Sequence, residues 1–259
     1  MNNRLLKSVS VLTVGLVLAP VFAMTASADG GDYDSNGYVS FEAGGTVIPV
    51  DPLSPTDLIT PTNPDGTTPA TGTAGPLSID FASSLSFGKQ AISSLDATYY
   101  AHAQYISGDK DGTTVDETRP NYVQVTDNRG SGSGWTLTVA ESNQFVTGDG
   151  NVLTGAELTF WKGKTLGTTS FTPSYVATNK EVISTADTKI IAAAAGEGMG
   201  TWAYRLGDNS DYQENGGAHL ILDAVSTASP ITLKVVAGTN LAKVYTTTLN
   251  WKLSDTPEN

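Results

Sequence analysis

Two histidines and no cysteine are the residues from which catalysis or metal binding would have to start. His102 and His219 lie beside Ala in strand-like runs, with no His-x-x-x-His or His/Cys spacing that would indicate a metal site. The loop Gly132-Ser133-Gly134 lacks the Gly-x-Ser-x-Gly pattern of a nucleophile elbow. Paired carboxylates could serve a glycosidase, but the 26 acidic residues are scattered along the chain. We therefore predict a protein without catalytic residues, cofactor or metal.

A second candidate is a calcium loop at Asp32, Asp34, Asn36 and Gly37, whose spacing copies the start of an EF-hand loop. The twelfth position should supply a bidentate carboxylate, but it is Ala43. We predict a solvated segment leading into a strand.

Aromatic residues give a stronger signal, because two of the four Trp begin the same Trp-x-Leu pattern, 116 residues apart. The tripeptides are Trp135-Thr136-Leu137 and Trp251-Lys252-Leu253, each within an alternating polar/apolar run. Side chains on a strand alternate between faces, so each Trp shares a face with its Leu. Such a face either belongs to the protein's core or stacks against a sugar or a partner protein. Both interpretations stay open from the residues alone.

The loop before Trp135 contains Asp127, Arg129 and Gly130. Glycine permits sharp turns, and an Asp/Arg pair can pin one. We expect either a structural clasp that positions the Trp135 strand or a contribution to binding.

Short strands rich in Thr, Val and Tyr, separated by Gly, Pro, Asn or Asp, must position these residues. The sequence predicts an all-β fold, an antiparallel β-sandwich or jelly-roll-like single domain with long loops. Ala192–Ala195 is the one expected helical or loop exception. The expected strands of the body are 77–81, 85–88, 98–105, 122–125, 134–139, 157–161, 201–206, 218–225, 231–236 and 244–253.

Residues 1–28 have the features of a secretory signal peptide: Arg4 and Lys7, an apolar stretch over 9–22, and Ala26-Ser27-Ala28 as the cleavage site. We then expect an N-terminal segment at 29–48 with a first strand at Tyr38–Phe41. A Pro/Thr-rich connector at 49–76 and the main β-domain at 77–259, packing with that strand, complete the chain.

Charge and termini limit the partners. The formal charge is −12, and it becomes −14 once the signal and its two basic residues are removed. Nucleic acid, anionic membranes and anionic wall polymers would therefore repel the protein. The sequence ends in Thr256-Pro257-Glu258-Asn259, without a Leu-Pro-x-Thr-Gly sorting signal, so we expect any cell-wall attachment to be non-covalent.

The chain resembles the WxL-domain cell-surface proteins of low-GC Gram-positive bacteria. The resemblance rests on both Trp-x-Leu strands with their flanks at 127–139 and 245–257, the Gly-x-Val-x-Phe run at 37–41, and 75–81. Asn250 and Lys252 depart from the family's usual polar residues at positions that alternate away from the Trp face.

This resemblance implies a protein held non-covalently on the cell wall, with peptidoglycan bound through the WxL domain. It also implies membrane-anchored partner proteins of the same surface complex and, for some members, adhesion to host matrix proteins. Carried over by motif, the candidate binding residues are Trp135, Leu137, Trp251 and Leu253. We therefore predict a non-catalytic surface-binding module. A host-directed adhesin or a subunit of a surface complex is the alternative, and a secreted glycoside-active enzyme is a remote one.

Overall fold

The computed structural model describes residues 32–45, 47–110, 113–215 and 225–257, and side chains are described outside 108–116 and 215. The predicted signal peptide, His219 and nearly all of the strand predicted at 218–225 lie outside these residues. The chain divides into two compact units, Met1–Phe41 and Glu42–Asn259.

The described part of the first unit contains no strand. Asp32 to Gly37 are exposed, and Tyr38 and Phe41 are 93% and 89% exposed. The prediction of a first strand at Tyr38–Phe41 is therefore wrong. Alternating Tyr, Val and Phe suit a strand, but a strand also needs a partner for its backbone groups.

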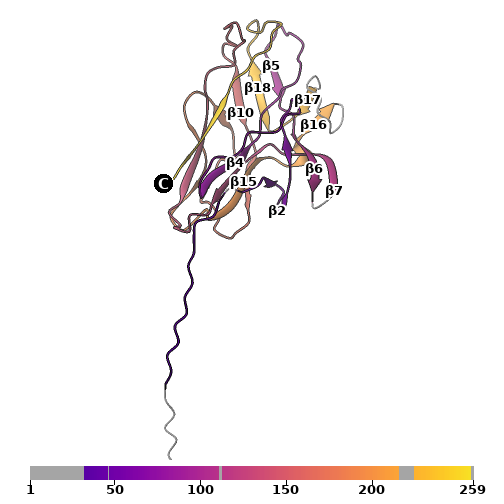
Figure 1. Cartoon of the computed structure of the whole chain (residues 1–259). Helices are drawn as coiled ribbons and strands as arrows, with labels where there is room; N and C mark the ends of the chain where they lie inside the picture. The colour runs from indigo at the N-terminus through magenta and orange to yellow at the C-terminus, as the bar shows by residue number, and fades with distance from the viewer. Residues whose placement is uncertain (1–31, 46, 111–112, 216–224, 258–259) are drawn as a thin grey trace, which may run out of the picture. The chain divides into compact units, whose positions relative to one another are not determined.

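Where the structure describes it, the second unit is all-β, and its strand pairs are antiparallel. Among the described residues no α-helix occurs, and the one helical turn is a 3-10 turn, η1 (Asn209–Asp211). The expectation of an all-β single domain is confirmed. Figure 1 shows β10, β18 and β5 side by side.

The described residues of this unit form five sheets. A six-stranded sheet has the order β13 (Glu181–Ile183), β10 (Glu157–Phe160), β18 (Ile231–Val235), β5 (Ala97–Tyr100), β17 (Val225–Ala228) and β16 (Gln213–Asn215). Two four-stranded sheets have the orders β11 (Gly163–Gly167), β15 (Gly200–Leu206), β8 (Tyr122–Asp127), β4 (Leu77–Ala82), and β12 (Tyr175–Val176), β14 (Thr188–Ala193), β9 (Trp135–Glu141), β19 (Leu249–Ser254). The smaller sheets are β3 (Pro61–Thr62), β6 (Gln104–Lys110), β7 (Thr113–Arg119), and β1 (Val50–Asp51), β2 (Ser54–Leu58).

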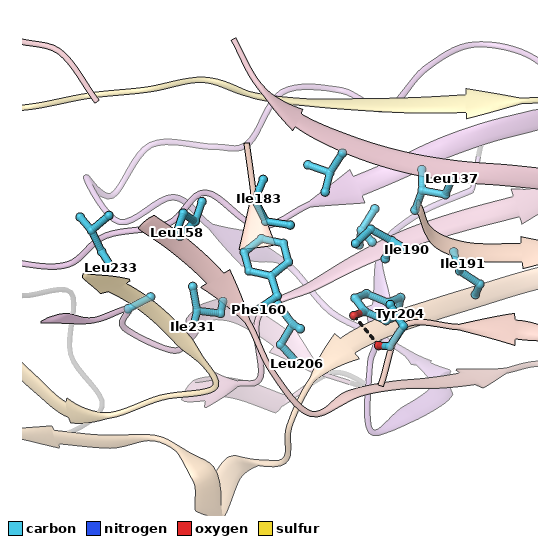
Figure 2. Packing of buried hydrophobic residues seen from close by; sticks show 14 of the residues in the cluster. Leu137, Leu158, Phe160, Ile183, Ile190, Ile191, Tyr204, Leu206, Ile231 and Leu233 are labelled. Carbon is cyan, nitrogen blue, oxygen red and sulfur yellow. Dashed lines mark hydrogen bonds between the residues drawn. The ribbon is translucent and has the colours of Figure 1, made fainter. Parts of the chain in front are cut away.

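One hydrophobic cluster joins the three larger sheets. It includes Leu158 and Phe160 from β10, Leu137 from β9 and Tyr204 from β15. Figure 2 labels these side chains among the buried residues of the cluster. The buried Tyr204 hydroxyl donates a hydrogen bond of 2.9 Å to the Ala177 carbonyl. This core supplies the stability that a chain without cysteine must obtain from burial alone.

Part of the predicted Pro/Thr-rich connector at 49–76 belongs to the folded domain, since Val50–Thr62 contributes β1, β2 and β3. The buried Asp51 pairs with Arg119 Nε at 2.7 Å, and the backbone N–H of Val50 donates to Gln124 Oε1, also at 2.7 Å. Buried polar partners far along the chain thus hold a segment whose composition predicts none of this order.

Three predicted strands differ in extent. Residues 85–88 form no strand, although Leu85 and Phe87 pack against the core. The stretch 98–105 divides into β5 and β6. Between them the Ala103 N–H donates to the side-chain Oε1 of Glu214 at 2.6 Å instead of to a backbone carbonyl. Of 244–253 only the last five residues belong to a strand, β19.

The expected exception at Ala192–Ala195 is also wrong at its start, since Ala192 and Ala193 belong to β14. Alanine has a low strand propensity, but here Ala193 pairs with Trp135 in the neighbouring strand and is fully buried. A small residue leaves room for the indole, so packing overrides propensity.

Candidate functional site: the paired Trp-x-Leu strands

The two Trp-x-Leu motifs lie on adjacent antiparallel strands, β9 and β19. Leu137 stands directly opposite Leu253, and Val139 stands opposite Trp251. Residues paired in this way project to the same face of a sheet, so both motifs point to one side. That side is the core: Trp135, Leu137 and Val139 belong to the main cluster, and Trp251 and Leu253 pack against it.

Trp135 is fully buried, with 0% exposure, as is Leu137. The indole Nε1 donates a hydrogen bond of 3.0 Å to the carbonyl of Gly198. A Cβ added at Gly198 would lie 2.5 Å from that nitrogen, and Gly198 has φ +68°, so only glycine fits there. The pocket is built around the indole, and Trp135 has no surface left for an external ligand.

Trp251 is only half-buried, because β19 is the last strand of its sheet. Its ring is nearly parallel to that of Phe160, with centroids 6.4 Å apart and an interplanar angle of 19°. A small apolar hollow separates the inner side of β19 (Leu249 and Trp251) from Phe160 and Leu206. Leu253 is half-buried as well.

Asp127 and Arg129 form a bidentate ion pair just before this ladder. Arg129 Nε and Nη2 lie 2.9 and 2.8 Å from the two carboxylate oxygens of Asp127, and Nη2 also donates to the Gly134 carbonyl at 2.7 Å. Asp127 raises the pKa of Arg129 through these hydrogen bonds. The pair ties the end of β8 to the residue before Trp135, while Gly130 makes an exposed turn with φ +70°.

A model of the WxL domain, described as a surface cell wall-binding domain, matches residues 28–257. The chain belongs to the WxL family. No curated protein and no solved structure matches it. The protein is therefore associated with the cell surface and the cell wall.

In this WxL domain the middle residues of the two motifs face away from the core. Lys252 is exposed and pairs with Asp187 at 2.7 Å, and Asn250 is exposed too. Thr136 donates from its hydroxyl to the Thr256 carbonyl at 3.1 Å. Both departures from the family pattern thus lie on the outward face, as the alternation predicts.

Glu141 ends the Trp135 strand inside the protein. The residue is buried on the same face of β9 as Trp135 and Leu137, and it stands opposite Leu249 of β19. Burial raises the pKa of its carboxyl to about 7. The group is thus a titratable charge at the boundary between the two motif strands.

Of the two histidines, His102 lies within the described residues. Its Nδ1 lies 3.4 Å from Glu214 Oε2. Within the described residues no group of three His, Cys, Asp or Glu could hold a metal ion, and no helix is long and apolar enough to cross a membrane.

Sequence reasoning overlooked Trp161, an exposed aromatic at the end of β10. Its side chain is 39% exposed, more than that of either motif Trp. The sequence Glu157-Leu-Thr-Phe-Trp161 already indicated this exposure. By strand alternation Trp161 falls on the side of Glu157 and Thr159, and the apolar residues fall on the other side. A Trp on the polar side of an amphipathic strand is a candidate for binding.

Proposed function

We propose that this protein is a non-catalytic, exported WxL protein that attaches non-covalently to the wall, and that peptidoglycan is the component it binds. The match of the wall-binding family over 28–257 carries this proposal. The net charge of −12 supports it, because the anionic polymers of a Gram-positive wall would repel the domain. A mostly uncharged polymer is the better ligand for such a surface.

The experiment is co-sedimentation of the purified mature protein with wall sacculi, before and after acid extraction of their anionic polymers. We expect binding to be kept or strengthened after extraction, and to be weakened little by 0.5 M salt, since the attraction is not ionic. A protein that stays in the supernatant with both preparations contradicts the proposal. Loss of binding on extraction would assign the ligand to the anionic polymers instead.

A further inference from the structure

The outer side of β10 differs from its inner side. Leu158 and Phe160 point into the core, as Figure 2 shows. Glu157 and Thr159 alternate with them and therefore lie on the opposite face. Trp161, the residue that follows β10, reaches Thr232 on that same face. This face of the six-stranded sheet carries the exposed Trp161 among polar side chains.

The indole of Trp161 is held in place by its neighbours. Its Nε1 lies 3.4 Å from the Thr232 hydroxyl on β18, and its backbone N–H donates to the Pro230 carbonyl at 2.8 Å. Because β18 is the next strand in the sheet, the ring must reach across from β10. A fixed aromatic ring loses little further freedom when a ligand stacks on it.

Small and apolar side chains complete the surface around the ring. Val182 on β13 and Thr232 on β18 both stand opposite Thr159. Thr159 is only 3% exposed although it lies on the outer face, so these side chains pack closely over it. Tyr100 on β5 stands opposite Thr232 and is half-buried, which places a second aromatic in the same row.

The charged groups at the rim neutralise one another. Lys180 Nζ lies 2.8 Å from Glu157 Oε1 and 5.9 Å from the centre of the Trp161 ring. The hydrogen bond from Lys180 lowers the pKa of Glu157, so Glu157 is a carboxylate at neutral pH. Lys234 lies 3.8 Å from Asp96 in the same way. These two ion pairs balance two cations against two anions around Trp161.

Such a face matches a neutral sugar chain. The apolar C–H side of a pyranose ring packs on an indole, while hydroxyl and amide groups need both donors and acceptors at the rim. Thr232, Lys180 and Glu157 offer both kinds of group. Neighbouring strands are about 4.8 Å apart, so Tyr100 lies about 10 Å from the axis of β10, a span suited to two linked sugar rings.

We propose that this face, centred on Trp161, binds the neutral N-acetylhexosamine glycan of the wall. The inference rests on the proposed function and assigns its contact surface. An anionic polymer would not be attracted to a surface whose charges are balanced. A protein partner would not require the hydrogen-bond donors and acceptors that surround the Trp161 ring.

The test compares Trp161→Ala with a matched control, Phe171→Ala. Phe171 is also an exposed aromatic, at 45%, but it lies in the loop between β11 and β12, beside Gly198. Co-sedimentation with extracted sacculi and titration with a soluble N-acetylglucosamine tetramer are the two assays. We expect Trp161→Ala to weaken both at least tenfold, Trp161→Phe to retain part of the binding, and Phe171→Ala to change either by less than twofold. Because Trp161 is on the surface, thermal melting should show all three variants folded.

The outcomes separate the two proposals. Wild-type protein that fails to sediment contradicts the proposed function itself. Wild-type and Trp161→Ala proteins that sediment equally overturn this inference and leave the proposed function standing. Equal losses in Trp161→Ala and Phe171→Ala also overturn it, as does Trp161-dependent sedimentation without any binding of the tetramer, which would indicate a non-glycan ligand.

Discussion

Strands β9 and β19 carry the same tripeptide pattern, yet they occupy different positions in their sheet. β9 lies between β14 and β19 and is buried along nearly its whole length, whereas β19 is an edge strand whose side chains alternate between half-buried and exposed. Trp135 has a hydrogen-bonded pocket closed by Gly198, and Trp251 covers a hollow beside Phe160. The comparison shows that one motif can define the centre of a fold at one position and seal its edge at another.

Replacing Trp135 should have the largest effect. The change Trp135→Ala removes a fully buried indole and leaves the Gly198 carbonyl without its donor. We expect a loss of about 3–5 kcal/mol in the free energy of unfolding. Urea titration followed by circular dichroism measures this. A loss below about 1.5 kcal/mol would show that β9 is not as much more buried than β19 as the structure indicates.

Trp251→Ala should cost less, about 1–3 kcal/mol, because the side chain is half-buried and its stacking on Phe160 is partial. The same urea titration applies, with Trp251→Phe as the control that keeps an aromatic ring. If this variant is as unstable as Trp135→Ala, β19 is not the weaker half of the ladder.

Glu141, at the boundary between β9 and β19, should make the stability of the folded state depend on pH. Its pKa is raised to about 7 by burial, so the unfolded chain releases this proton at lower pH than the folded one. The folded state therefore loses stability through this group as pH rises from about 4.5 to 7, and below about 4.5 there is no loss. Glu141→Gln should abolish the decline and be more stable than wild type at pH 8, by roughly 1–2 kcal/mol after allowing for partial hydration.

Melting temperatures of both proteins at pH 4.5 and 8 make the measurement. Curves for the two proteins that stay parallel over this range would mean that Glu141 is not buried beside β19.

Lys252→Ala should have the smallest effect. The pair with Asp187 is exposed, with both side chains about half accessible, so the change should stay within about 0.5 kcal/mol. Urea titration in low and high salt makes this measurement. A larger loss of stability would show that the outward face of β19 contributes to folding, contrary to what its exposure indicates.

Sequence alternation predicted most strands that build the core, because Leu158/Phe160 and Trp135/Leu137 each mark an inner face. It could not tell β9 from β19, because the position of a strand in a sheet depends on pairing partners far along the chain. It also misjudged Val50–Thr62, whose order comes from contacts such as Asp51 with Arg119, 68 residues away. Composition indicates only the local structural preference of a segment, and it does not predict contacts with residues far along the chain.

The candidate site shows the same limit. The Trp-x-Leu residues were recognised as a family signature, but the choice between core and contact required their exposure. Trp161 lacked a repeated motif and was overlooked, although its register with Glu157 and Thr159 marked it as outward-facing. The face of the strand on which a residue lies therefore indicates its exposure better than its membership of a motif does.

The most direct measurement records the four indole N–H signals of a nitrogen-15-labelled protein during titration with the N-acetylglucosamine tetramer. We expect the Trp161 signal to shift with saturation, while the Trp135 signal, buried and bonded to Gly198, stays in place and exchanges slowest with solvent. A saturating shift at Trp135 with none at Trp161 would contradict the claim that the Trp-x-Leu ladder is the core and that the wall is contacted elsewhere.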